Sequence, residues 1–246
     1  MIRTVGGTPQ ASADLPTGEA KTAQVRAMFD AIAPRYDLVN RIITLGLDRR
    51  WRSRTFDALG LPGGSTVLDL DCGTGDFADL VVRRGCRVVG SDLSAGMLSA
   101  RHHPFPAVQA DAAALPLATG SLDGVVCGYA LRNFTDLAAS LAEAARVLRP
   151  GGRLAVLEVA TPENGVMRRG FDVWFGRCVP AIGGLLSDGA AYRYLPRSTA
   201  YLPDKDDLRR MLVEAGFATV GRQLLHGGLS QVITATRRGM PGGGAE

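Results

Sequence analysis

The sequence contains almost no lysine. Lys21 and Lys205 are its only two, so nearly all of the 28 basic residues among 246 are arginine. The formal net charge of +4 and the pI near 9.1 would suit a nucleic-acid partner. No run of five basic residues occurs, however, so a nucleic-acid footprint is not predicted. Attraction to an anionic membrane surface stays open.

Cysteine is also scarce. Cys72, Cys86, Cys127 and Cys178 lack the close spacing of a zinc site or a disulfide framework. We therefore predict no metal site and small buried thiols in a reducing compartment. No apolar run is long enough to cross a bilayer, and no signal peptide is visible. This predicts a cytoplasmic protein, with a peripheral contact to the inner face of the membrane left open.

The length and the ordinary content of 46% apolar and 21% charged residues fit one α/β domain. Residues 1–20 and 239–246 are small, polar and without periodicity, which predicts disordered tails. The folded domain is expected to span residues 21–238.

The stretch TVLDLDCGTGD, residues 66–76, carries the first indication of function. Thr66–Leu70 has the apolar, β-branched character of a buried strand, and the Cys72–Gly75 segment can form a tight turn. Asp76 then begins an amphipathic helix. Strand, glycine turn and helix form the unit that builds a nucleotide-type site at the carboxyl edge of a parallel sheet.

The charge of this turn indicates which ligand it binds. A dinucleotide fingerprint needs three spaced glycines, but Asp71 stands at the first glycine position, between Asp69 and Asp76. Three carboxylates would repel a pyrophosphate and would suit the sulfonium and ammonium groups of S-adenosylmethionine. The alternative is that these carboxylates serve only as backbone caps. An NAD-dependent dehydrogenase is disfavoured by the acidic turn.

Alternating strand and helix patterns predict a Rossmann-like sheet of seven strands, with the last two forming an antiparallel hairpin at one edge. Residues 21–60 form an N-terminal helical cap in this interpretation, with a helix from Lys21 to Pro34 and one long helix over 38–59. The insertion 160–203 after the fifth strand is expected to form a lid.

Acidic residues are predicted to end the second and third strands as well. Asp92 lies where a carboxylate binds the hydroxyls of a ribose, and Ser94 is the better helix cap nearby. Asp111, followed by Ala112, could accept a hydrogen bond from an adenine amine, or be a solvated loop carboxylate.

Several stretches together resemble a known family. VLDLDCGTGD, QADAAALP (109–116) and RVLRPGGRL (146–154) are similar to class I S-adenosylmethionine-dependent methyltransferases. Residues 28–52, ALRNFTD (130–136), AYRYLPRST (191–199) and residues 202–217 resemble the ubiquinone/menaquinone biosynthesis C-methyltransferases. The resemblance implies methylation of a ring carbon of a prenylated hydroquinone, of the demethylmenaquinol type, with S-adenosylmethionine as cofactor. Another phenolic or polyketide-like acceptor is the alternative, because residues 227–239 depart from the usual ending.

The resemblance also implies roles for single residues. The methionine part of the cofactor would lie on Gly73, Thr74 and Gly75, and Gly128 stands where the family often has serine. Asp69 belongs to the same acidic turn, Asp92 would bind the ribose, and Asp111 and Ala112 would bind the adenine. Asp71 replaces the small residue that the family has there, which predicts a change in cofactor affinity or orientation.

Carbon methylation of a phenolic ring needs a positive group that stabilises the phenolate. Arg132, just after the fourth strand, is the candidate, and Asn133 could orient the ring oxygen or a water. The alternative for Arg132 is a structural ion pair. Tyr36 is a third catalytic candidate, and Tyr192 and Tyr194 are expected on the substrate side, although all three could be core residues.

The remaining features favour no single role. The three histidines, His102, His103 and His226, follow surface elements and are predicted to be peripheral. The apolar run 171–186 fits core packing, a lid over a lipid-soluble quinol, or the interface of a homodimer.

Overall fold

The computed structural model describes residues 16–239. The predicted disorder of 1–15 and 240–246 lies outside that range. Inside it, one boundary was wrong: helix α2 (Gly18–Ile32) begins before Lys21, with Thr17 as an extended N-cap and Glu19 in the first turn. An acidic side chain there interacts favourably with the positive end of the helix dipole.

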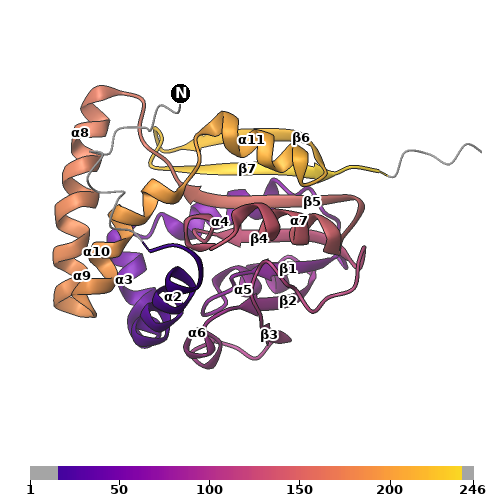
Figure 1. Cartoon of the computed structure of the whole chain (residues 1–246), viewed down its shortest axis with the longest axis horizontal. Helices are drawn as coiled ribbons and strands as arrows, with labels where there is room; N and C mark the ends of the chain where they lie inside the picture. Colours follow the sequence, from indigo (N-terminus) through magenta and orange to yellow (C-terminus); the bar gives the residue numbers. More distant parts are fainter. Residues whose placement is uncertain (1–15, 240–246) are drawn as a thin grey trace, which may run out of the picture.

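One sheet of seven strands runs through the molecule in the order β3-β2-β1-β4-β5-β7-β6 (Figure 1). The number of strands and the antiparallel hairpin at one edge agree with the prediction. Strands β1 to β5 pair in parallel, and β7 pairs antiparallel with both β5 and β6. The strands are β1 Thr66–Leu70, β2 Arg87–Asp92, β3 Ala107–Gln109, β4 Leu122–Gly128, β5 Leu148–Val159, β6 Phe217–Leu225 and β7 Ser230–Arg237.

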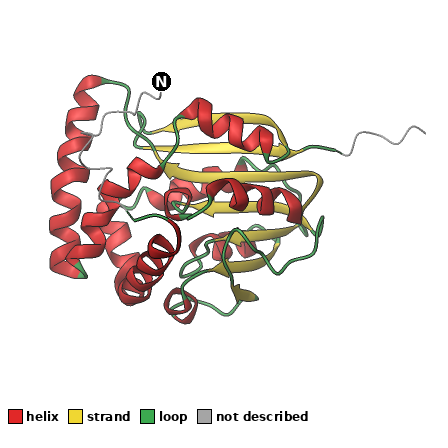
Figure 2. Cartoon of the chain, viewed as in Figure 1, coloured by secondary structure: helices red, strands yellow, loops and turns green. Residues whose placement is uncertain are grey.

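Helices cover both faces of this sheet (Figure 2). Helices α4 and α5 pack on one face, and α7 and α11 on the other. The bounds are α4 Asp48–Asp57, α5 Asp76–Arg83, α6 Ala95–Ser99, α7 Leu137–Val147 and α11 Lys205–Glu214. Both faces of the sheet are apolar because each is covered by helices. In strand β4, Val125 and Cys127 point to the core under α7, and Val126 points to the core under α4 and α5. Each such buried side chain contributes about 1.5–3 kcal/mol.

The remaining helices gather at one end of the sheet (Figure 1). They are α2, α3 (Tyr36–Ile43), α8 (Gly165–Val173), α9 (Val179–Leu186) and α10 (Gly189–Ser198). A π-helical turn, Trp174–Cys178, joins α8 to α9. The indole Nε1 of Trp174 donates a hydrogen bond of 3.0 Å to the carbonyl of Ile43, which ties this long helical segment to α3.

The single helix predicted over 38–59 was wrong. Helix α3 ends at Ile43 and α4 starts at Asp48, because Leu45 and Gly46 have positive φ angles of 53° and 72°. The Gly46 amide donates to the carbonyl of Arg41 at 2.8 Å, a bond that closes the end of α3. The glycine inside the predicted helix was the signal for this break.

The predictions about the cysteines and about membrane-spanning segments can be compared with the structure. Cys72, Cys86 and Cys127 are buried free thiols, as predicted, whereas Cys178 is half-buried. None of the helices within residues 16–239 combines the length and the hydropathy that a bilayer-spanning segment needs.

Candidate active site

The register of the sheet brings the ends of three strands together. Leu70, the last residue of β1, lies beside Ser91 of β2 and Cys127 of β4. Asp71, Asp92 and Gly128 therefore stand at the same edge of the sheet. This edge is where ligands bind in open α/β folds.

The glycine turn after β1 fits its surroundings closely. Gly73 and Gly75 have φ angles of 55° and 101°. A Cβ atom on Gly75 would lie 2.7 Å from the ring of Phe105, so a side chain does not fit there. Asp69 is buried and accepts a hydrogen bond of 2.8 Å from the amide of Ala78, near the start of α5. Burial raises the pKa of Asp69 to about 8.

Asp92 connects this turn to the second strand. One carboxylate oxygen accepts from the Gly73 amide at 2.7 Å, and the other accepts from the Ser94 amide at 2.8 Å. Ser94 is the N-cap of α6, since its hydroxyl accepts from the Met97 amide at 3.0 Å, as the sequence predicted. Burial raises the pKa of Asp92.

A small cavity of about 30 Å³, which we call the acidic cavity, lies at this edge. Asp71, Asp92, Asp111 and Ala112 all line it, and Phe29 of α2 closes it from the cap side. The structure therefore brings together the predicted residues from the ends of three strands. The other five predicted cofactor residues, Asp69, Gly73, Thr74, Gly75 and Gly128, are not in the described lining of this cavity. The contacts of Asp69 and Gly75 are given above, which leaves three.

Of these three, Thr74 is buried and donates to Asp37 of α3 at 2.7 Å. Gly128 lies against Phe77, whose ring would be 2.8 Å from an added Cβ atom. Gly73 has open space in the direction of a Cβ atom.

A second, larger cavity of about 350 Å³, which we call the apolar cavity, lies between the cap helices and the segment α8–α10. Its walls are mainly aliphatic and aromatic, including Met28, Ile32, Trp51, Phe171, Trp174 and Leu195. The five predicted catalytic and substrate residues all line it: Tyr36, Arg132, Asn133, Tyr192 and Tyr194. Mostly apolar walls with a few polar groups are typical of small-molecule sites.

Arg132 is held by a buried ion pair with Glu158 at the end of β5, and its Nε donates to the hydroxyl of Ser198 at 3.2 Å. The structural pair that the sequence analysis left open is thus present, although Arg132 also lines the apolar cavity. Its neighbour Asn133 lines both cavities, as does Phe29. These two residues form a shared wall between the cavities.

Three buried polar groups of the apolar cavity have no hydrogen-bond partner within the described residues. They are the side-chain nitrogen of Asn40 and the hydroxyls of Tyr192 and Tyr194. Buried polar groups in native proteins are nearly always hydrogen-bonded, so these atoms indicate where a ligand would bind. Asn40 lies in the stretch 28–52 that resembles the family, but it was not among the predicted site residues.

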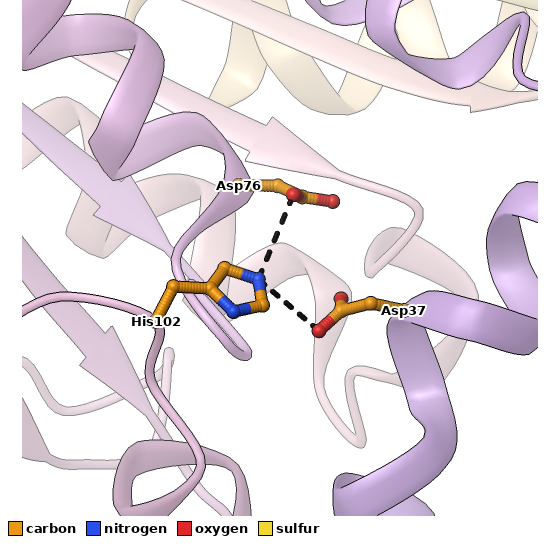
Figure 3. A group of neighbouring side chains, drawn as sticks. All are labelled: Asp37, Asp76 and His102. Atoms are coloured by element: carbon orange, nitrogen blue, oxygen red, sulfur yellow. Dashed lines mark ion pairs between the residues drawn. The ribbon is translucent and has the colours of Figure 1, made fainter.

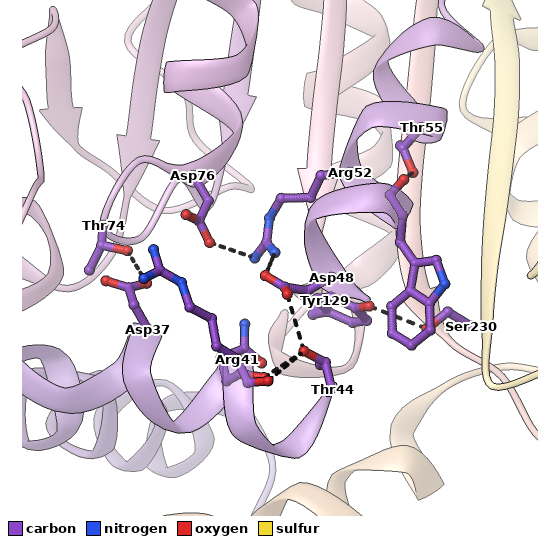
Figure 4. Close-up of polar contacts among 12 residues, drawn as sticks. Asp37, Arg41, Thr44, Asp48, Arg52, Thr55, Thr74, Asp76, Tyr129 and Ser230 are labelled. Carbon is purple, nitrogen blue, oxygen red and sulfur yellow. Dashed lines mark hydrogen bonds and ion pairs between the residues drawn. The ribbon is translucent and has the colours of Figure 1, made fainter. Parts of the chain in front are cut away.

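A network of polar contacts near the glycine turn was not predicted from the sequence (Figure 4). Buried Arg52 contacts Asp48 at 2.9 Å and Asp76 at 3.3 Å. The Tyr129 hydroxyl lies 3.2 Å from that of Ser230, which joins the end of β4 to β7. Asp48 and Arg52 lie one turn apart on α4, whereas Asp76 and Ser230 reach their partners from distant parts of the chain.

All three histidines are exposed, in agreement with the prediction, but two of them make polar contacts that the sequence did not indicate. His102 Nε2 lies 3.1 Å from Asp37 and 3.9 Å from Asp76 (Figure 3). These three side chains are close enough to hold a metal ion, but Thr74 and Arg52 already bind the other oxygens of the two carboxylates. His226 Nδ1 accepts a 2.7 Å hydrogen bond from the indole of Trp51.

Known proteins are similar in sequence to this chain over most of its length. A protein from Syntrophotalea carbinolica, named ubiquinone/menaquinone biosynthesis C-methyltransferase UbiE, is 40% identical over 226 residues, covering 88% of this chain and 95% of its own. A demethylmenaquinone methyltransferase from Corynebacterium kroppenstedtii is 40% identical over 223 residues, covering 90% and 97%.

Solved structures share the fold. A SAM-dependent methyltransferase from Thermotoga maritima has a TM-score of 0.60 at 20% identity, covering 87% of this chain and all of its own. Phosphoethanolamine N-methyltransferase 2 of Haemonchus contortus, solved with S-adenosylhomocysteine, has a TM-score of 0.57 at 13% identity, covering 76% and 52%. The model of the ubiE/COQ5 methyltransferase family matches residues 17–237. The chain belongs to the ubiE/COQ5 methyltransferase family.

Proposed function

We propose that this protein transfers a methyl group from S-adenosylmethionine to a ring carbon of a prenylated hydroquinone, of the demethylmenaquinol type. The names of the relatives at 40% identity support this acceptor. The observation that carries the proposal is the wall that Asn133 and Phe29 form between an acidic cavity and an apolar one. The charged methyl donor and the apolar acceptor would meet at this wall.

The acidic cavity fits S-adenosylmethionine by its chemistry. Asp92 would hold the ribose hydroxyls, Asp111 and Ala112 the adenine, and the turn Gly73–Gly75 the methionine part, with Asp69 and Gly128 beside them. When bound, the cofactor supplies an electrophilic methyl group on a sulfonium. The family relationship and the acid-lined wall support this assignment.

In the apolar cavity the residues of this chain would position and activate the ring. Arg132 would stabilise the phenolate that makes the neighbouring carbon nucleophilic, and Asn133 would orient the ring oxygen or a water. Asn40 and Tyr194 offer unpaired polar groups for the ring hydroxyls. Tyr36 and Tyr192 would cover the ring and exclude water.

Contact with a membrane would deliver such an acceptor. We define the apolar end face by the exposed side chains of Leu38, Leu45, Val166, Val173 and Leu185, which are 52–84% exposed and lie around α3, α8 and α9. Exposed arginines, Arg168, Arg169 and Arg177, stand on the same helical segment. Exposed apolar side chains with basic neighbours favour the surface of an anionic bilayer.

The test is to supply methyl-labelled S-adenosylmethionine and a demethylmenaquinol to the full chain and to identify the labelled product. We expect label on a ring carbon. The variant Asn133→Ala should lower kcat by roughly a hundredfold, while the Kd of S-adenosylhomocysteine changes less than about threefold. Arg132→Lys is the companion variant, because Arg132→Ala would leave Glu158 buried without its partner. Label on an oxygen, or none, would contradict the proposal.

A further inference from the structure

Asp71 occupies a backbone position that favours glycine. It follows β1 directly and has a φ of 56°, a left-handed conformation that glycine adopts freely and aspartate only with strain. The φ angles of Gly73 and Gly75, two and four residues later, are also positive. A side chain kept at a strained position beside a cavity indicates a role for that side chain.

The Asp71 carboxylate differs from the other acidic groups around the acidic cavity. Each of those accepts a hydrogen bond from a backbone amide: Asp69 from Ala78, Asp92 from Gly73 and Ser94, and Asp111 from Ala113. Within residues 16–239 no donor stabilises the charge on Asp71. Burial and the negative charges of Asp92, Asp111 and Asp69 raise its pKa well above the usual value.

Among residues 16–239 no ion pair gives Asp71 a positive partner either. Among the described residues that line the acidic cavity, Arg26 of α2 is the basic one. Its charge acts on Asp30, which lies on the same helix and accepts from Ser94 and Gly96. The ion pairs among residues 16–239 include none that joins Arg26 to Asp71. If a cation enters the cavity, its positive charge would therefore stabilise the ionised form of the Asp71 carboxyl group.

We propose that Asp71 makes the acidic cavity select its ligand by charge, so that it holds the sulfonium methyl donor in preference to the uncharged thioether left after transfer. This inference rests on the proposed function. Asp71 would ionise as the cation enters and release a proton to solvent. The demethylated product lacks the sulfonium charge, so it would gain less from Asp71 and leave more readily.

Calorimetric titration of the full chain tests this directly. Kd values for S-adenosylmethionine and S-adenosylhomocysteine are measured for the wild type, Asp71→Asn and Asp71→Gly. We expect both variants to lose about tenfold in affinity for the sulfonium ligand and less than about threefold for the thioether. Repeating the wild-type titration in buffers of different ionisation enthalpy should reveal proton release for the first ligand, which Asp71→Asn abolishes.

Two controls separate charge from folding. Asp206→Asn removes the same charge from the exposed first turn of α11 and should change neither Kd. Asp71→Gly relieves the positive φ, so its Tm should equal or exceed that of the wild type. Equal losses for both ligands, or no loss, would overturn the inference while leaving the proposed function intact. A wild-type chain that binds neither ligand would overturn both.

Discussion

Asp69 is a buried carboxyl group whose proton is linked to folding. Its pKa is raised from 3.8 to about 8 by burial, so between these pH values the folded state holds a proton that the unfolded chain has lost. The contribution of this group to the free energy of unfolding therefore falls as the pH rises from about 4 to about 8.

The variant Asp69→Asn should reveal this dependence, since its amide oxygen can still accept from Ala78. Relative to the wild type, the variant should gain on the order of a few kcal/mol as the pH rises through that window. Urea unfolding of both proteins at several pH values gives the difference. A difference that stays constant with pH would show that Asp69 is ionised in the folded protein.

At the scale of residues, the sequence was informative where chain order alone places groups together. Asp71, Asp92 and Asp111 each lie at or just after the carboxyl end of a parallel strand, so their meeting at one edge could be predicted. The partner of Arg132 could not, because Glu158 reaches it from the next strand. His102 joins Asp37 only because the cap folds over the glycine turn.

At the scale of elements, helices α9 and α10 meet at a glycine. A Cβ atom on Gly183 would lie 2.0 Å from the ring of Tyr192, so α10 packs directly on the α9 backbone. Tyr192 also lines the apolar cavity. The position of this tyrosine in the proposed acceptor site therefore depends on the absence of a side chain at Gly183.

The variant Gly183→Ala should push α10 away from α9, at a cost of about 1–3 kcal/mol. We expect a higher KM for the quinol, with an unchanged Kd for S-adenosylhomocysteine, because the acidic cavity lies elsewhere. Gly176→Ala is the matched control, since nothing lies within 4 Å of its added methyl group. Equal effects of both variants on KM would argue against this packing role.

Elements were predicted well where a strand or helix has a single strong period. The bounds of β1, Thr66–Leu70, agree fully with the prediction. The α3–α4 region failed because its apolar pattern continues across a turn, and only Gly46 marks the break. The π-helical turn Trp174–Cys178 has no local signal, since its sequence is compatible with an ordinary helix.

At the scale of the whole molecule, the apolar end face predicts binding to lipid vesicles. The wild type should sediment with anionic vesicles and much less with zwitterionic ones. Leu45→Glu and Leu185→Glu, at positions 73% and 84% exposed, should each reduce binding by roughly tenfold.

Val82→Glu provides the control for this experiment. Val82 is 57% exposed, but it lies on α5 and not on the apolar end face. The Val82→Glu variant should therefore bind vesicles as well as the wild type does. If all three variants lose binding equally, added negative charge alone is the cause, and the end face has no special part.

The position of β7 has a consequence for how the protein is made. Among residues 16–239 this strand follows the other six in sequence, yet it lies between β5 and β6 and pairs with both. Until the ribosome has added Ser230–Arg237, the edges of β5 and β6 that β7 will occupy stay unpaired. The sheet cannot close before this strand has been made, and the nascent chain depends until then on whatever shields those edges from neighbours.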